Sequence, residues 1–270
     1  MDIQKVLLIS QEIDPYLTGT NTAEFSRTMA QQLQEKGAEV RCFMPRFGAI
    51  NERRNQLHEV IRLSGLNIEI DDTDHPLIIK VATLQPSRLQ VYFIDNDDYF
   101  YRHTQQKTLE IDDQPETNDE RAIFFVRGVI ETVKKLRWNP DLVICCGWIS
   151  SLVPLYLRTI YGDDPSFTGS KIVYALAGKP FAGSLNSRMI EKLKDEGLTE
   201  EQIKSVAEED GIIDFNRLNR IAVDASDAVI DSGADSDSTC VEYAAASGKP
   251  FLAFNEANGA DEYFEFFKSL

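Results

Sequence analysis

The side chains best placed for chemistry follow one apolar run of the sequence. Leu142–Cys146 has the composition of a buried strand, and Gly147 and Trp148 come directly after it, before a helical stretch. In an α/β protein, a strand that ends in such a turn presents a site at the carboxyl edge of the sheet. A thiol nucleophile needs a neighbouring base, and no histidine lies near Cys146 in the sequence. We therefore expect neither nucleophilic catalysis at Cys146 nor a disulfide between Cys145 and Cys146 in a reducing cytosol.

Four residues have the chemistry of a carbohydrate-binding groove, namely Asp95, Asn96, Tyr99 and Trp148. Sugar faces stack on aromatic rings, while carboxylates and amides form hydrogen bonds with sugar hydroxyl groups. These residues also have structural alternatives. Trp148 can anchor the core beneath the turn, and Asp95 and Asn96 can cap the short helix that follows them.

A second candidate site is the start of a predicted helix after the loop Thr18–Thr20. Asn21–Glu24 combines a capping residue with an acidic residue three positions later, which is typical of a helix N-terminus. Free N–H groups and the positive end of the helix dipole attract anions there. The alternative is that Asn21 or Thr22 only caps the helix.

Metal and cofactor sites are not predicted. The three histidines lie far apart in the sequence, and the four cysteines show no metal-ligand spacing. Those residues are His58, His75, His103, Cys42, Cys145, Cys146 and Cys240. We expect no metal and no cofactor.

Five apolar runs separated by helical patterns predict an α/β fold with a mainly parallel, Rossmann-like sheet covered on both faces. The predicted strands are Val6–Ser10, Ala38–Met44, Leu142–Cys146, Lys171–Leu176 and Ala228–Ile230. Short β-like runs between Leu57 and Ile94 predict an antiparallel extension of this sheet. With no internal repeat or low-complexity linker, we expect a single domain over residues 1–270.

Helical periodicity and capping signals predict four main helices. They start near Asn21 and Asn118, span Phe215–Val223, and form a C-terminal docking helix over Asp261–Leu270. The polar stretch Gln105–Asp119 lies between the antiparallel region and the helix that starts near Asn118, and it predicts a surface loop.

The charge of the chain excludes two classes of partner. Its formal net charge is −16, and residues 194–270 carry 18 Asp and Glu against 6 Lys and Arg, a net of −12. Such a surface repels nucleic acids and anionic lipid heads. No apolar run reaches the roughly 18 residues of a membrane span, and no secretory pattern precedes the first strand. We expect a cytoplasmic protein that binds neither nucleic acid nor membrane.

The order of several sequence blocks resembles the N-terminal half of bacterial glycogen and starch synthases. The resemblance extends from about residue 3 to residue 232 and is closest to short, standalone members of that group. Its strongest blocks are Glu12–Tyr16, Val40–Ile50, Val91–Asn96, Asn118–Leu136 and Pro140–Tyr161. The family implies a GT-B arrangement of two Rossmann-like halves, of which this chain resembles the first.

Two family motifs are altered in this chain. The K-T-G-G-L loop aligns with Thr18–Thr22, so the resemblance assigns Thr18, Gly19, Thr20 and Asn21 to the nucleotide, without the family's lysine. The histidine and aspartate of V-H-C-H-D-W fall on Cys146 and Gly147. No stretch after residue 232 resembles the donor-binding half. We therefore expect little glucose transfer by this chain alone.

Two interpretations follow from the resemblance. In the first, the chain is a retaining glucosyltransferase that moves glucose from ADP-glucose or UDP-glucose to an α-1,4-glucan. In the second, it is a non-catalytic module that binds a glucan or a partner synthase. The partners implied are an α-glucan, a nucleotide sugar and a partner synthase chain.

Overall fold

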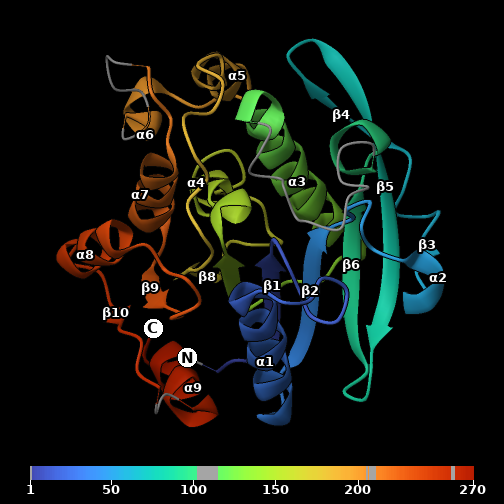
Figure 1. Ribbon diagram of the computed structural model, residues 1–270, viewed down its shortest axis with the longest axis vertical. Helices are drawn as coiled ribbons and strands as arrows, with labels where there is room; N and C mark the ends of the chain where they lie inside the picture. The colour runs from blue at the N-terminus through green and yellow to red at the C-terminus, as the bar shows by residue number, and fades with distance from the viewer. Residues whose placement is uncertain (1, 102–114, 205, 207–210, 257–258) are drawn as a thin grey trace.

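The computed structural model describes residues 2–101, 115–204, 206, 211–256 and 259–270. Its centre is a sheet with the strand order β10-β9-β8-β7-β1-β2-β6-β5-β3, and β4 pairs with β5 beside it (Figure 1). The strands are β1 Lys5–Ser10, β2 Glu39–Pro45, β3 His58–Glu59, β4 Leu66–Ile70, β5 Thr73–Leu84, β6 Leu89–Asp95, β7 Leu142–Cys146, β8 Lys171–Leu176, β9 Ala228–Asp231 and β10 Phe251–Leu252.

The sheet is parallel from β10 to β6 and antiparallel beyond. All pairs from β10–β9 through β2–β6 run parallel. The pairs β6–β5, β5–β3 and β5–β4 run antiparallel. A strand buried on both faces reads as a continuous apolar run, and every residue of β7 is buried. The predicted parallel sheet with its antiparallel extension is confirmed.

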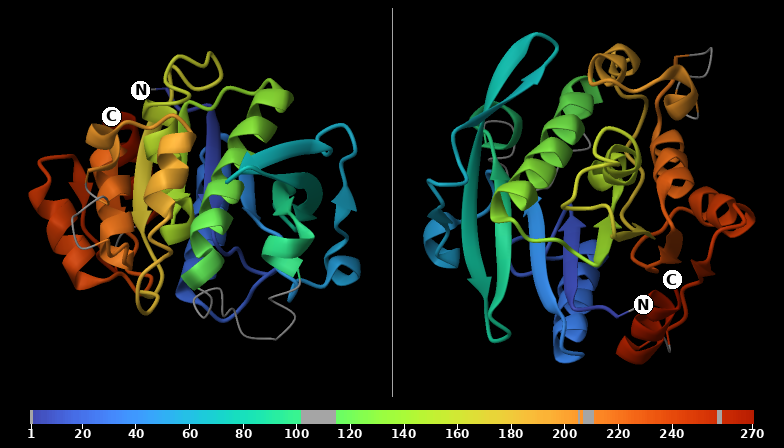
Figure 2. Two further views of the ribbon diagram at one scale, coloured as in Figure 1. Left: turned by 90° about the horizontal axis from the view of Figure 1, so that it is seen from above. Right: turned by 180° about the vertical axis from the view of Figure 1, so that it is seen from behind.

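Helices cover both faces of the sheet. Figures 1 and 2 show α1 and α9 on one face and α3, α4 and α7 on the other. The helices are α1 Asn21–Glu35, α2 Glu52–Asn55, the π-helix η1 Asp97–Tyr101, α3 Pro115–Leu136, the 3-10 helix η3 Trp148–Ser150, α4 Leu152–Arg158, α5 Met189–Asp195, α6 Glu200–Ile203, α7 Phe215–Ala225, α8 Ser238–Ala246 and α9 Ala260–Ser269. None of the described helices is both long and apolar enough to cross a bilayer.

The helix starts differ from the predictions at two places. Thr20, rather than Asn21 or Thr22, is the N-cap of α1, since its side chain accepts the N–H of Ala23. The predicted loop over Gln105–Asp119 is wrong at its end, because α3 already begins at Pro115. Proline suits the first turn of a helix, where its missing N–H is not needed. Residues 105–114 of that loop lie outside the described residues.

Helix α9 covers the residues expected to form a C-terminal docking helix, and it packs against α1. Tyr263 and Phe267 are its buried residues. The ring of Tyr263 meets Phe25 of α1 edge-on, with 6.2 Å between centroids. Lys36, at the end of α1, forms an ion pair with Asp261.

Candidate functional site

The chain changes direction across the sheet at β1. From β1 it continues through β2 to β6 on one side, and α3 then returns it to β7 on the other side of β1. In open α/β sheets, ligands bind where the strand order reverses in this way, in the crevice at the carboxyl ends of the strands. The topology therefore points to the space above β1 and β7 (Figure 1).

A cavity of about 330 Å³ lies at this place. Its walls come from the segments that follow β1, β7, β8 and β9, and from the first turn of α1. The lining residues are Gln11, Glu12, Gly19, Thr20, Asn21, Thr22, Gly147, Trp148, Ala177, Gly178, Lys179 and Asp235. The structure thus brings together Gly19, Thr20, Asn21, Gly147 and Trp148, which are far apart in the sequence. Thr18 is exposed and does not line the cavity.

The start of α1 forms one wall. Thr20 Oγ1 donates a hydrogen bond to the Glu12 carboxylate and accepts one from Ala23 N at 3.2 Å. Asn21 Nδ2 donates to Asp235 Oδ1 at 3.3 Å. The backbone N–H groups of Asn21 and Thr22 donate to no described residue. These two N–H groups, at the positive end of a 15-residue helix, favour an anion.

The end of β7 contributes no ionisable side chain to the cavity. Cys146 is fully buried, and burial raises the pKa of its thiol to about 12, against a smaller opposing effect of a hydrogen bond with Ser26. Gly147 has no side chain, and its backbone has φ 80° and ψ 165°. The wall therefore offers neither a general acid nor a general base near neutral pH.

Trp148 is mainly a core residue. Its side chain is 1% exposed, and its ring packs edge-on against Phe181 with 5.1 Å between centroids. Its indole N–H has no hydrogen-bond partner among the described residues. The anchoring alternative predicted for Trp148 fits this geometry better than a sugar-stacking platform does.

Asp95 and Asn96 do not line the cavity. Asp95 is buried beside Lys80 Nζ at 2.8 Å and Arg46 Nε at 3.8 Å. Burial raises the pKa of Asp95, although the hydrogen bond from Lys80 opposes this shift. Asn96 Oδ1 accepts from the N–H groups of Asp98 at 3.0 Å and Tyr99 at 3.1 Å. Asn96 thus caps η1, which is the structural alternative given above.

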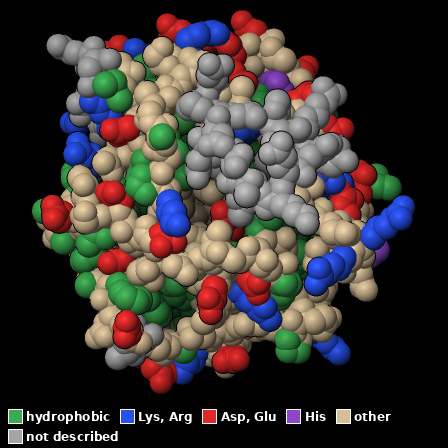
Figure 3. All heavy atoms as spheres, in the orientation of Figure 1, with side chains coloured by type: hydrophobic (Ala, Val, Ile, Leu, Met, Phe, Trp, Pro, Cys, Tyr) green, Lys and Arg blue, Asp and Glu red, His purple; other side chains and the backbone are tan. Residues whose placement is uncertain are grey.

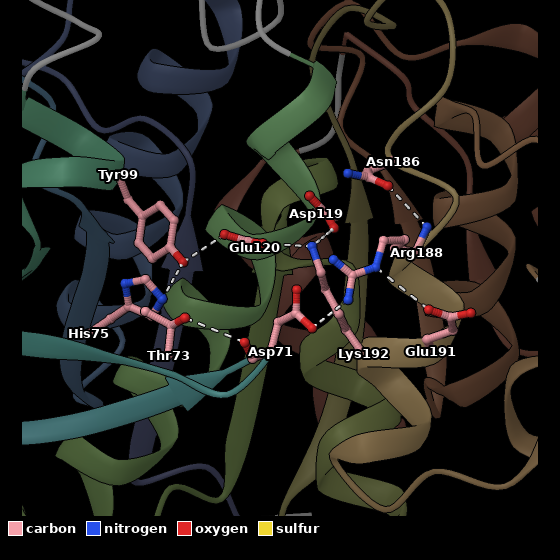
Figure 4. A network of polar contacts seen from close by, with 10 residues as sticks. All are labelled: Asp71, Thr73, His75, Tyr99, Asp119, Glu120, Asn186, Arg188, Glu191 and Lys192. Carbon is pink, nitrogen blue, oxygen red and sulfur yellow. Dashed lines mark hydrogen bonds and ion pairs between the residues drawn. The ribbon is translucent and has the colours of Figure 1, made fainter.

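Tyr99 belongs to a separate polar network at the N-terminal end of α3 (Figure 4). Its hydroxyl donates to Glu120 Oε2 at 2.9 Å and lies 2.9 Å from His75 Nε2. Because that hydroxyl has a single proton, His75 must be the donor in the second contact. Burial, followed by the charge of Glu120, raises the pKa of Tyr99. The network continues from Glu120 to Lys192 Nζ at 2.6 Å.

Four polar residues of the cavity lie outside the candidate sites predicted from the sequence, namely Gln11, Glu12, Lys179 and Asp235. Gln11 and Glu12 directly follow an apolar strand, a position that faces the site in this class of sheet, so their place could have been predicted. Lys179 and Asp235 lie in irregular loops whose path the sequence pattern does not fix. Among the described residues, no group of three His, Cys, Asp or Glu side chains comes close enough to hold a metal ion.

Comparison with known proteins gives the family. The starch synthase catalytic domain family matches residues 5–231. The chain is 37% identical over 192 residues to the glycogen synthase of Chlorobium luteolum, covering 71% of this chain and 39% of that protein. It is 35% identical over 191 residues to the glycogen synthase of Chlorobaculum parvum, with the same coverage of 71% and 39%. The chain thus spans about two fifths of the length of these relatives.

The fold is also that of a known catalytic domain. The catalytic domain of starch synthase IV from Arabidopsis thaliana, bound to ADP and acarbose, superposes with a TM-score of 0.72 and 16% sequence identity. The match covers 94% of this chain and 51% of that one. At this identity the structural likeness supports the fold alone, a GT-B glycosyltransferase domain. Together with the match over residues 5–231, these findings mean that the chain belongs to the starch synthase catalytic domain family, which includes the glycogen synthases.

Proposed function

We propose that this chain forms the half of a glycogen or starch synthase cleft that holds the phosphate groups of a nucleotide sugar beside an α-glucan. We propose further that it transfers little glucose by itself. The observation that carries the proposal is the cavity at the carboxyl ends of β1 and β7, into which the N-terminus of α1 opens. The Arabidopsis neighbour was bound to ADP and acarbose, which supports a nucleotide and a glucan-like ligand for this fold.

The residues suit binding better than catalysis. Gly19, Thr20 and Asn21 are assigned to the phosphate groups, where backbone N–H groups and a helix dipole stabilise negative charge. At Cys146 and Gly147, where the family resemblance places histidine and aspartate, the wall carries a buried neutral thiol and no side chain. Loss of one electrostatic partner in an active site commonly costs about 2 to 4 kcal/mol of transition-state stabilisation.

The lack of an ionisable group at Cys146 and Gly147 favours an alternative. In that alternative, the chain is a non-catalytic module that binds a glucan or a partner synthase. In both versions the ligands are an α-glucan and ADP-glucose or UDP-glucose, and the setting is the cytoplasm. Residues 1–270 act as one domain, with α9 docked on α1. Trp148 is assigned a supporting role beneath the cavity wall, whereas Asp95, Asn96 and Tyr99 are assigned structural roles at β6, η1 and the start of α3.

Ligand binding by the full chain separates these versions. We would titrate ADP-glucose, UDP-glucose, ADP and maltoheptaose, following weak binding by ligand-observed NMR. Binding of a nucleotide sugar together with glucan supports the synthase half-site, and glucan binding alone supports the module. Binding of none of them contradicts both.

A matched pair of variants locates the nucleotide. Asn21 lies at the exposed mouth of the cavity, so Asn21→Trp should block ADP without disturbing the core. Asn67→Trp makes the same change at an exposed position of β4, away from the cavity, and should leave ADP binding intact. Equal ADP affinity in both variants would place the nucleotide elsewhere.

A further inference from the structure

One exposed lysine on the cavity wall has no described partner. Lys179 follows β8 and lines the cavity. It forms no ion pair or hydrogen bond with any other described residue, unlike Lys80 and Lys192, which are tied to buried carboxylates. A lysine without a partner at the wall of a cavity is available to a ligand with negative charge.

The backbone holds the loop that carries this lysine against the start of α1. Gly178 has φ +87°, and its N–H donates to Ala234 O at 2.8 Å, which ties the loop after β8 to the loop after β9. A Cβ atom on Gly178 would lie 3.5 Å from Thr22 Oγ1. The loop that carries Lys179 therefore passes directly over the first turn of α1, where the N–H groups of Asn21 and Thr22 have no described acceptor.

A buried amide completes the polar wall. Gln11 is 9% exposed, and its one described side-chain contact is a 3.5 Å hydrogen bond from its Nε2 to Glu12 Oε1. Its Oε1 accepts no hydrogen bond from a described residue and lies 3.8 Å from the position of a Cβ atom on Gly147, another lining residue. Gln11 lines the cavity, so a ligand hydroxyl group there could donate a hydrogen bond to this amide oxygen.

The charges on the cavity wall make Lys179 important for the binding of an anion. The carboxylates of Glu12 and Asp235 also line the cavity, and both accept hydrogen bonds from the α1 wall, from Thr20 and Asn21. Without Lys179 the wall would present two negative charges and no cation. A diphosphate can bind there only where the cation and the helix N-terminus together outweigh those carboxylates.

We propose that Lys179 is the residue whose ammonium group contacts the phosphate groups of a nucleotide in this cavity, in place of the lysine that the family resemblance assigns to the position of Thr18. Thr18 is exposed and lies outside the cavity, so the two positions approach the ligand from different walls. The inference rests on the proposed nucleotide binding. It adds the residue whose positive charge this binding would depend on.

The test compares a charged and an uncharged ligand. ADP and adenosine would be titrated by NMR into the full chain and into Lys179→Met, Lys179→Arg and Lys171→Met. Lys171 is the matched control, since it opens the same strand β8 at the opposite, amino end and has no described side-chain partner. We expect Lys179→Met to weaken ADP binding by about twofold to fivefold, as one partly exposed ion pair does.

Adenosine binding should be unchanged in every variant, and Lys179→Arg should retain ADP binding. Added salt should weaken ADP binding less in Lys179→Met than in the unaltered chain, because one screened contact has been removed. Unchanged ADP affinity in Lys179→Met overturns the inference and leaves the proposed function intact. Equal weakening of ADP and adenosine also overturns it, since the lysine would then only shape the loop. Failure of the unaltered chain to bind ADP contradicts the proposed function itself.

Discussion

At Gly147 the backbone excludes the side chain that the family resemblance places there. Its φ of 80° and ψ of 165° fall in a region that glycine alone adopts readily. Space is not the obstacle, because a Cβ atom at this position would have its nearest neighbour, Ala177 O, at 3.7 Å. Restoring an aspartate would therefore strain the turn before it could contribute any chemistry.

Gly147→Ala should destabilise the fold by about 1 to 3 kcal/mol through backbone strain alone. Gly169→Ala is the matched control, because Gly169 lacks a positive φ and a Cβ atom there would meet nothing within 4 Å. Urea unfolding gives the free energy of unfolding of both variants. Equal stability would mean that the turn relaxes at no cost and that an aspartate is tolerated.

A second prediction at the residue scale concerns the buried thiols. Burial raises the pKa of Cys42 and Cys146 from 9.0 to about 12, so both stay protonated at pH 8. All four cysteines are free and buried, and a thiol-specific reagent at pH 8 should label them only after unfolding. Rapid labelling of one cysteine in the native chain would show that Cys146 is open to the cavity.

The same shift predicts how stability depends on pH. The unfolded thiols lose their protons near pH 9, whereas the folded thiols keep theirs until about pH 12. The native state thus binds more protons in that interval, and stability falls as the pH rises through it. The urea midpoint should be lower at pH 10 than at pH 8, and an equal or higher midpoint would contradict the buried positions of these thiols.

At the scale of elements, a buried charge cluster joins α5 to the N-terminal end of α3. Lys192 is 3% exposed and lies 2.6 Å from both Asp119 Oδ2 and Glu120 Oε1 (Figure 4). Burial lowers the pKa of Lys192, but the hydrogen bonds that Lys192 donates to the two carboxylates outweigh this effect, so the pKa is raised. At the same end of α5, Arg188 reaches Asp71 at the tip of the β4–β5 hairpin at 2.6 Å.

Lys192→Met should destabilise the chain by about 3 kcal/mol, because it leaves Asp119 buried without its cation. Lys194→Met removes a cation from the same helix, where the lysine is exposed and paired with Glu200. Its effect should be below about 0.5 kcal/mol. Chemical unfolding of both variants checks this, and similar losses would mean that the cluster does not hold α5 in place.

A second element-scale expectation concerns α9. Phe267 is fully buried in the contact of this helix with the body, whereas Phe264 is half-buried. Phe267→Ala should cost about 3 to 5 kcal/mol, as for other large core side chains, and Phe264→Ala should cost less. A small effect of Phe267→Ala would show that α9 is not part of the cooperative fold, which bears on the proposed single domain.

The sequence predicted those strands that are buried on both faces and those helices that have a long apolar periodicity. Leu142–Cys146 and Lys171–Leu176 matched their strands residue for residue, because parallel strands between two helical layers must be apolar throughout. The sequence Thr199–Gln202 also has the pattern of a capping box, and the structure forms that box at the start of α6. Helix α8 and the two-residue strand β10 were missed, because both are short and neither shows a long apolar periodicity.

The roles of the candidate site residues were harder to predict from the sequence, for a different reason. Residue type predicted what Asp95, Asn96 and Tyr99 can bind, but the partners of a polar side chain are set by neighbours distant in the sequence. Lys80, Pro76 and Glu120 occupy those groups here. The position of the cavity follows from the strand order. The presence of Lys179 and Asp235 in its lining, in contrast, depends on the path of two loops.

At the scale of the whole molecule, the cavity lies in a strongly acidic protein. Figure 3 shows Asp and Glu side chains spread over one face of the molecule, in keeping with a net charge of −16. A surface of this charge disfavours anions by long-range repulsion. Any nucleotide must therefore be held by local contacts, for which we propose the α1 N-terminus and Lys179 on the cavity wall.

The most direct test of the account is glucose transfer by the unaltered chain. Radiolabelled ADP-glucose and, separately, UDP-glucose would be incubated with the protein and glycogen, and label incorporated into glycogen would be counted. A functional glucosyltransferase from this family serves as the positive control. Because Cys146 and Gly147 place no ionised group at the reacting centre, we predict incorporation close to the background without protein. Turnover near about one per second, within the usual range of enzymes, would contradict the account.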